Sequence, residues 1–149
     1  IRTFQKELIM NLKKFALLSI CCLLFALPAA FSQHTKYKAV YQLNSDDDKA
    51  IRNTLRNIKN ALEDPRLKDK VKIELVVHGA GVVAYKKDHP YETLLKELSD
   101  KGVILVECEN TLRERKIAKE ELFPFIQYTP SGNGELIIKQ AKGWSYVHP

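Results

Sequence analysis

The chain has 149 residues and a formal net charge of +6, from 24 Lys and Arg against 18 Asp and Glu. Residues 1–32 hold four of the basic residues and one of the acidic residues, so residues 33–149 carry 20 basic and 17 acidic side chains, a balance of +3. That is an ordinary protein surface, and no basic stripe interleaved with aromatic residues runs along it, which argues against nucleic-acid binding.

Residues 1–32 are predicted to lie outside the fold, as upstream residues followed by a signal peptide. Met10 is the expected initiator; two lysines follow it, then the almost wholly apolar residues 15–27, and Ala30 and Ser32 fit a signal-peptidase site. The apolar run is shorter than the roughly 20 residues of a membrane-spanning helix. We therefore expect a periplasmic or secreted protein without stable membrane insertion after cleavage; a retained anchor is the alternative.

Strands and helices alternate along residues 33–149. Apolar and β-branched runs predict five strands, at 37–43, 71–77, 103–106, 125–129 and 144–147. Capping residues and apolar residues at helical spacing predict four helices, at about 45–64, 88–101, 111–121 and 131–142. This order predicts one α/β domain, a three-layer α/β/α sandwich with a mainly parallel five-stranded sheet.

Short polar motifs mark where several helices are expected to begin. Ser45 and Asp48 resemble a capping box, and the three consecutive aspartates there suit the positive end of a helix dipole; a divalent-cation site is the alternative. Thr111 and Glu114 have the same capping-box form, and Ser131 is a candidate cap for the last helix.

Cys108 follows a strand that is predicted to be buried on both faces. Cleavage of the signal peptide would remove Cys21 and Cys22 and leave this thiol alone, so it cannot form an internal disulfide. An unpaired thiol in an exported protein is buried and inert, paired with another molecule, or reactive. Ligands collect at the carboxyl edge of such sheets, and backbone N–H groups at the start of the next helix favour the thiolate. We expect a modestly activated thiol; a cysteine that serves as a small hydrophobic core residue is the alternative.

The charges next to Cys108 act in opposite directions. Three basic residues follow within two helical turns and favour the thiolate: Arg113, Arg115 and Lys116. Glu107 and Glu109 flank the cysteine and disfavour it, although strand alternation should point both away from the face that the sulfur uses.

His78 is the candidate catalytic partner of Cys108, because it also ends a predicted parallel strand. If the two strands are neighbours, imidazole and thiol could come within hydrogen-bond reach; a polar residue that merely closes the strand is the alternative. Gly79 would let the backbone approach a ligand, but no dinucleotide-binding glycine pattern follows. Asn110 and Thr111 are helix caps whose turn could also hold an anion such as a persulfide or sulfate.

Metal and cofactor motifs are not evident in the sequence. The four histidines show no close ligand pair and nothing resembles a zinc knuckle: His34, His78, His89 and His148. A P-loop and a serine-hydrolase elbow are also missing. We expect no metal and no cofactor.

Together these segments resemble the DsrE/DsrF-like family over residues 37–147. The resemblance rests on Gly102-Val-Ile-Leu-Val-Glu-Cys108-Glu-Asn110-Thr111-Leu112, on Pro130-Ser131-Gly132, on Gly143-Trp-Ser-Tyr146 and on a second strand that ends in His78-Gly79. It implies a three-layer α/β/α fold and a homo-oligomer, often a trimer or hexamer. It also implies sulfur relay, with Cys108 as the residue that accepts sulfur.

The leading hypothesis is therefore that Cys108 accepts or transfers sulfane sulfur as a persulfide, with a donor or acceptor protein as partner and with His78 and the Asn110-Thr111 turn shaping the pocket. Two alternatives remain: a non-catalytic oligomer that binds a small anion at the same edge, and a thiol redox sensor that forms intermolecular disulfides or a sulfenic acid.

Overall fold

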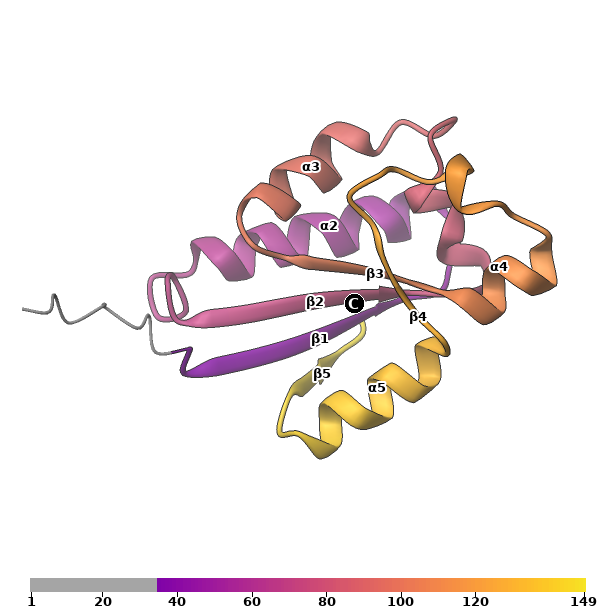
Figure 1. The fold of residues 1–149 in the computed structure, drawn as a ribbon. Coiled ribbons are helices and arrows are strands. Elements are labelled where there is room, and N and C mark those ends of the chain that lie inside the picture. Colours follow the sequence, from indigo (N-terminus) through magenta and orange to yellow (C-terminus); the bar gives the residue numbers. More distant parts are fainter. Residues whose placement is uncertain (1–34) are drawn as a thin grey trace, which may run out of the picture. The chain divides into compact units, whose positions relative to one another are not determined.

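The computed structural model describes residues 35–149, which form a five-stranded sheet with helices around it (Figure 1). The strands are β1 (Tyr37–Leu43), β2 (Val71–Val77), β3 (Ile104–Cys108), β4 (Gln127–Thr129) and β5 (Ser145–Val147). Their order in the sheet is β4-β3-β2-β1-β5, and every neighbouring pair is parallel. The predicted five-stranded parallel sheet is confirmed.

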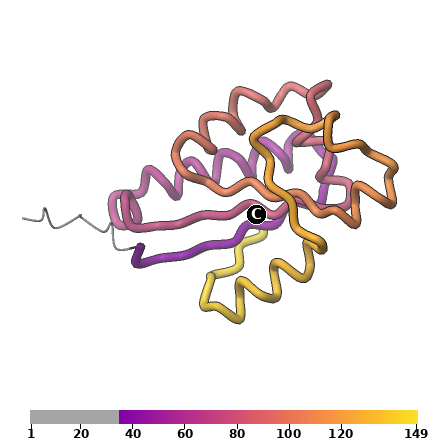
Figure 2. The backbone as a smooth tube through the Cα atoms, viewed as in Figure 1, coloured from indigo at the N-terminus to yellow at the C-terminus, as the bar shows by residue number. Residues whose placement is uncertain are grey.

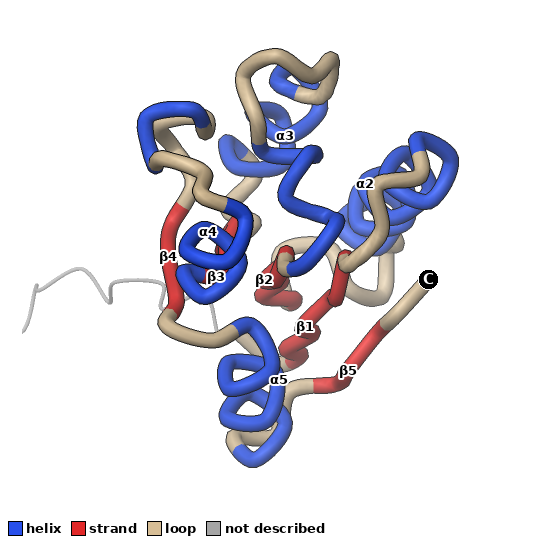
Figure 3. The backbone as a smooth tube through the Cα atoms, turned by 90° about the vertical axis from the view of Figure 1, so that its right-hand side faces the viewer, coloured by secondary structure: helices blue, strands red, loops and turns tan. Residues whose placement is uncertain are grey.

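Helices cover both faces of the sheet. They are α2 (Asp48–Glu63), α3 (Glu92–Asp100), α4 (Glu109–Arg115) and α5 (Gly132–Ala141), with two 3₁₀ segments, η1 (Gly79–Tyr85) and η2 (Lys119–Glu121). Figures 1 and 3 show α2 and α3 on one face, α5 on the other, and α4 beyond the carboxyl edge of the strands. This is the predicted α/β/α sandwich.

Strand alternation divides the apolar side chains between two cores of unequal size. On β1, Tyr41 and Leu43 pack into the large core beneath α2 and α3, whereas Val40 packs with Val76 and Leu136 beneath α5. The large core is closed by apolar faces at helical spacing on the two covering helices: Ile51, Leu55 and Ile58 of α2, and Leu95 and Leu98 of α3. Among residues 35–149, the small core has those three buried members, with Trp144 packed against it.

Three predicted helix starts differ from the structure. The helix expected from Asp88 begins only at Glu92, with Tyr91 as the N-cap of α3, because residues 87–91 form turns and a bend. Asp47, not Ser45, caps α2, because the Asp47 carboxylate accepts the Ala50 N–H at 2.8 Å while the Ser45 hydroxyl accepts the N–H of Asp47 itself. In addition, α4 begins at Glu109, directly after the strand, so Thr111 lies in its first turn and is not its cap. This helix is also shorter than predicted, since Lys116 adopts a left-handed conformation (φ 56°) and ends it.

The chain returns to one edge of the sheet several times. Figure 2 traces the chain from β3 into α4, back through β4 and into α5. Cys108, which ends β3, pairs with Thr129, which ends β4, so the two strands end at the same edge of the sheet. Among residues 35–149, no helix combines the length and apolar character needed to cross a membrane. The predicted signal peptide lies outside the described residues and stays a prediction.

Candidate functional site

Cys108 is the last residue of β3, which pairs with β2, and His78 and Gly79 directly follow the end of β2. Leu105 of the same strand faces the large core, so the alternation of side chains places Cys108 on the α5 face. The side chain is a free thiol and is only 5% exposed. The predicted neighbourhood of the two strand ends is therefore present.

Hydrogen-bond donors surround the Cys108 sulfur from two segments of the chain. Burial raises the pKa of the thiol, but the N–H groups of Thr111, Gly132 and Asn110 and the Thr111 hydroxyl outweigh burial and hold the pKa below its ordinary value. Donors of this kind stabilise a thiolate over a thiol. The modest activation that the sequence predicts agrees with this direction.

The Thr111 hydroxyl connects Gly79 to the sulfur. Its oxygen accepts the Gly79 N–H at 2.8 Å, which leaves the hydroxyl proton free to be donated to Cys108. Gly79 adopts a positive φ of 59°, a conformation that favours glycine, and so presents its N–H to Thr111. Two predicted ligand-binding residues are thus brought together with the thiol, although Gly79 reaches it through Thr111.

Gly132, at the start of α5, was not predicted as a site residue. Its N–H faces the Cys108 sulfur, and a Cβ added to it would lie 2.9 Å from Cβ of His78. Only glycine lets α5 approach this closely. Ser131 caps the helix, as predicted, by accepting the Gly134 N–H at 3.2 Å. The sequence signal was the Pro130-Ser131-Gly132 turn, but nothing in it indicated a contact with β3.

His78 is close to this arrangement but makes no hydrogen bond with Cys108 in the described part of the chain. Its Nε2 lies 2.7 Å from Nε2 of Gln42 on β1. Burial and the nearby His148 lower the pKa of His78, so the imidazole is neutral at neutral pH. The two predicted catalytic residues therefore share Gly132 as a neighbour, and a proton-accepting role for His78 stays a prediction.

The family model for the DsrE/DsrF-like family matches residues 38–149. The chain belongs to this family. A similar solved structure is MTH1491 of Methanobacterium thermoautotrophicum, a protein of unknown function, with 29% sequence identity and a TM-score of 0.72 over 76% of this chain and 99% of that one. The ychN protein of E. coli is similar in fold, with 16% identity and a TM-score of 0.56 over 77% of this chain and 99% of that one. No curated protein sequence matches the chain.

The two glutamates beside the thiol of this DsrE/DsrF-like protein differ in charge. Glu107 is buried on the opposite face of the sheet, and burial raises its pKa to about 9, so it is neutral at neutral pH and does not oppose a thiolate. Glu109 is paired with Lys119 at 2.6 Å, which lowers its pKa and compensates its negative charge. The expected opposition from both carboxylates is therefore largely removed.

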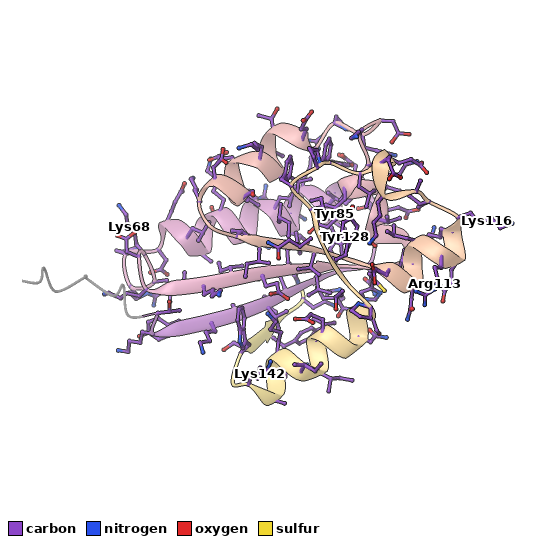
Figure 4. The ribbon with its side chains drawn as sticks, viewed as in Figure 1. Lys68, Tyr85, Arg113, Lys116, Tyr128 and Lys142 are labelled. Atoms are coloured by element: carbon purple, nitrogen blue, oxygen red, sulfur yellow. The ribbon has the colours of Figure 1, made fainter. Side chains whose placement is uncertain are left out.

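The basic residues of α4 lie at the same edge as the thiol. Figure 4 shows Arg113 and Lys116 extending from α4 there, while Lys68 lies at the opposite edge. The Arg113 guanidinium donates to Oδ1 of Asn110. The side chain of Asn110 therefore holds a cation, while its backbone N–H is one of the donors that lower the pKa of Cys108. No cluster of three or more His, Cys, Asp or Glu side chains within residues 35–149 is arranged to hold a metal ion.

Proposed function

We propose that this DsrE/DsrF-like protein carries sulfane sulfur as a persulfide on Cys108. The observation that carries the proposal is the set of donors around one sulfur: three backbone N–H groups and a hydroxyl, from residues 110–111 and from Gly132. A buried thiol that served only as a core residue would have a raised pKa. Here the donors reverse that direction, which favours a nucleophile that exists as a thiolate.

The proposed step is thiol–disulfide exchange with a persulfide donor. The Cys108 thiolate attacks the terminal sulfur of a donor R–S–SH; a new S–S bond forms on Cys108, the donor S–S bond breaks, and R–S⁻ leaves and takes up a proton. The transferred atom enters and leaves at the oxidation level of sulfane sulfur, so the step needs no external oxidant. Attack by an acceptor thiolate on the terminal sulfur of the Cys108 persulfide reverses it.

The surrounding residues have distinct proposed roles. Thr111 and the N–H of Asn110 would stabilise the anionic sulfur, and Gly79 would hold the Thr111 hydroxyl in place. His78 would close the α5 side of the pocket. A groove of about 560 Å³ runs along α4, the helix that follows Cys108; it is lined by Leu112 and Ile117 and edged by charged side chains, and is the proposed contact surface for the donor or acceptor protein.

Assembly and location are also proposed here. Ile137 and Ile138 on α5 are 67% and 48% exposed, which favours their burial against another copy in a homo-oligomer such as a trimer or hexamer. The signal-peptide pattern at residues 10–32 favours a periplasmic or secreted location.

The test is the rate of Cys108 alkylation against pH, followed by exposure to polysulfide. Trypsin would release Cys108 in the peptide 102–113 and the other two cysteines in the peptide 15–36, so each can be measured separately. We expect a thiolate that titrates below about 8.5 and a gain of about 32 Da, one sulfur atom, that reduction removes. Cys108→Ser should lose both signals in peptide 102–113.

Other results would favour the alternatives. A thiol that alkylates only on unfolding would contradict sulfur transfer and favour binding of a small anion by the same N–H groups. A disulfide-linked dimer that forms with peroxide, without a stable persulfide, would favour the redox sensor. Thr111→Val, which removes the hydroxyl, should raise the pKa of Cys108. Thr111→Ser keeps the hydroxyl and should leave the pKa of Cys108 unchanged.

A further inference from the structure

A chain of hydrogen bonds crosses the sheet on the face that carries the Cys108 sulfur. The Tyr146 hydroxyl on β5 donates to Oε1 of Gln42 on β1, and Nε2 of Gln42 lies 2.7 Å from Nε2 of His78 after β2. Figure 3 shows β2, β1 and β5 in this order, with α5 below β2 and β1 and beside β5. Gln42 follows Val40 of the small core by two residues, so it belongs to the same α5-covered face.

The chemistry of the amide assigns the proton on His78. An amide nitrogen can only donate, so Nε2 of His78 must accept from Gln42 with its lone pair, and the imidazole proton is on Nδ1. The structure orients the amide with its oxygen toward the Tyr146 hydroxyl, which donates to it. In the opposite orientation the hydroxyl would accept from the amide nitrogen and the imidazole proton would be on Nε2, so the proton position on His78 tests this orientation directly. Burial and His148 favour the neutral imidazole as well, since both lower the pKa of His78.

His78 packs directly against Gly132, the first residue of α5. Atoms of Gly132 approach the imidazole so closely that a Cβ there would lie 2.9 Å from Cβ and 3.2 Å from Cγ of His78. The N–H of the same glycine is one of the donors that lower the pKa of Cys108. A change in the orientation of the imidazole would therefore move one of the donors that stabilise the thiolate.

We propose that Gln42 and Tyr146 are positioning residues of the thiol site. They hold His78 in one orientation as the neutral, Nδ1-protonated imidazole, and His78 supports Gly132 with its N–H directed at Cys108. In the sulfur transfer proposed above, on which this role rests, the arrangement keeps the Gly132 N–H available to stabilise the anionic sulfur. His78 then acts through Gly132 and is itself a positioning residue, not the base that deprotonates the thiol.

Two measurements on the full chain test this. Long-range ¹H–¹⁵N correlation spectra report which imidazole nitrogen carries the proton, with the His78 signals assigned by their loss in His78→Gln. The alkylation rate of Cys108 at pH 7, measured on peptide 102–113, reports the thiolate. We expect His78 to be protonated on Nδ1 in the wild-type protein and on Nε2 in Gln42→Glu, because a carboxylate accepts where the amide donates.

The remaining variants distinguish loss of the hydrogen bonds from Gln42 and Tyr146 from the effect of any substitution in the sheet. Gln42→Leu and Tyr146→Phe should give a mixture of His78 tautomers and slow Cys108 alkylation roughly three- to tenfold, the effect of losing about one ordinary hydrogen bond. The matched controls are Gln127→Leu on β4 and Tyr37→Phe at the far end of β1, which should change neither signal. Tyr146→Phe removes a single hydroxyl at an exposed position, so it keeps the test valid if Gln42→Leu does not fold.

Three outcomes would overturn the proposal. They are a wild-type His78 protonated on Nε2, a wild-type His78 with a mixed tautomer population, and variants that change the tautomer without slowing Cys108. If the tautomer and rate respond as expected but polysulfide never modifies Cys108, the positioning role stands and only the proposed sulfur transfer fails.

Discussion

Glu107 is the residue beside the thiol whose energetics are most unusual. It is fully buried in β3, and neither of its carboxyl oxygens has a hydrogen-bond partner among the described residues. Burial raises its pKa from 4.5 to about 9. Between those two values the folded protein therefore keeps a proton that the unfolded chain releases, so the free energy of unfolding falls as the pH rises, by about 1.4 kcal/mol per pH unit from this group.

Glu107→Gln should remove this pH dependence, because the amide has the same shape and does not titrate. We expect the stability of the variant relative to the wild-type protein to increase steadily from pH 5 to pH 8 in urea unfolding. Glu109→Gln is the control: its carboxylate has a lowered pKa, so its contribution to stability is lost only in acid and its difference from wild type should be flat over this range. Parallel stability curves for Glu107→Gln and wild type would show that Glu107 is ionised in the folded protein.

At the scale of elements, the start of α5 is a close approach that bears directly on the thiol. Gly132→Ala would place a Cβ 2.9 Å from Cβ of His78, so the helix must shift and carry the Gly132 N–H away from Cys108. We expect the alkylation rate at pH 7 to fall about tenfold, the equivalent of one pKa unit, and unfolding by urea to occur about 1–3 kcal/mol more easily. Gly134→Ala, two residues along the same helix, should leave the Cys108 titration unchanged. Equal rates in the two variants would mean that Gly132 does not support the thiolate.

The elements themselves were largely predictable, because each depends on a local pattern. The alternating apolar residues of β1 predicted both of its faces, and Gly102, with a φ of 87°, ends the segment after α3 as expected. The predicted start of α4 was wrong because of a contact with a residue far away in the sequence. The hydroxyl of Thr111 accepts from Gly79, 32 residues away, instead of capping its own helix, and no local motif reports that contact.

The site was predictable only in part, for the same reason. Cys108 ends one strand, and Thr111 and Gly79 come shortly after the ends of two adjacent strands, so a parallel sheet was enough to place them at one edge. Gln42 and Tyr146 join them because the last strand pairs with the first, which places residues 104 positions apart in contact. Strand order of this kind depends on which apolar faces pack together, and a single sequence does not specify it.

For the whole molecule, the unequal cores imply unequal local stability. The face under α2 and α3 buries most of the apolar side chains, whereas α5 is held by Leu136, by Trp144 and by the ion pair between Lys139 and the buried Glu74. Elements with few buried apolar contacts open at lower free energies than the central strands. The layer that carries Gly132 is therefore the one expected to open first, and its opening would withdraw a donor from Cys108.

Native-state hydrogen exchange should show this difference, with amides of α5 exchanging through openings of lower free energy than those of β2 and β3. The protein concentration distinguishes two origins of any protection in α5. If a second copy covers the exposed Ile137 and Ile138, protection of α5 should rise with concentration, because association stabilises only the closed form. Protection of α5 equal to that of β2 at every concentration would instead show that α5 opens only when the whole domain unfolds. The Gly132 N–H would then be withdrawn from Cys108 only by global unfolding.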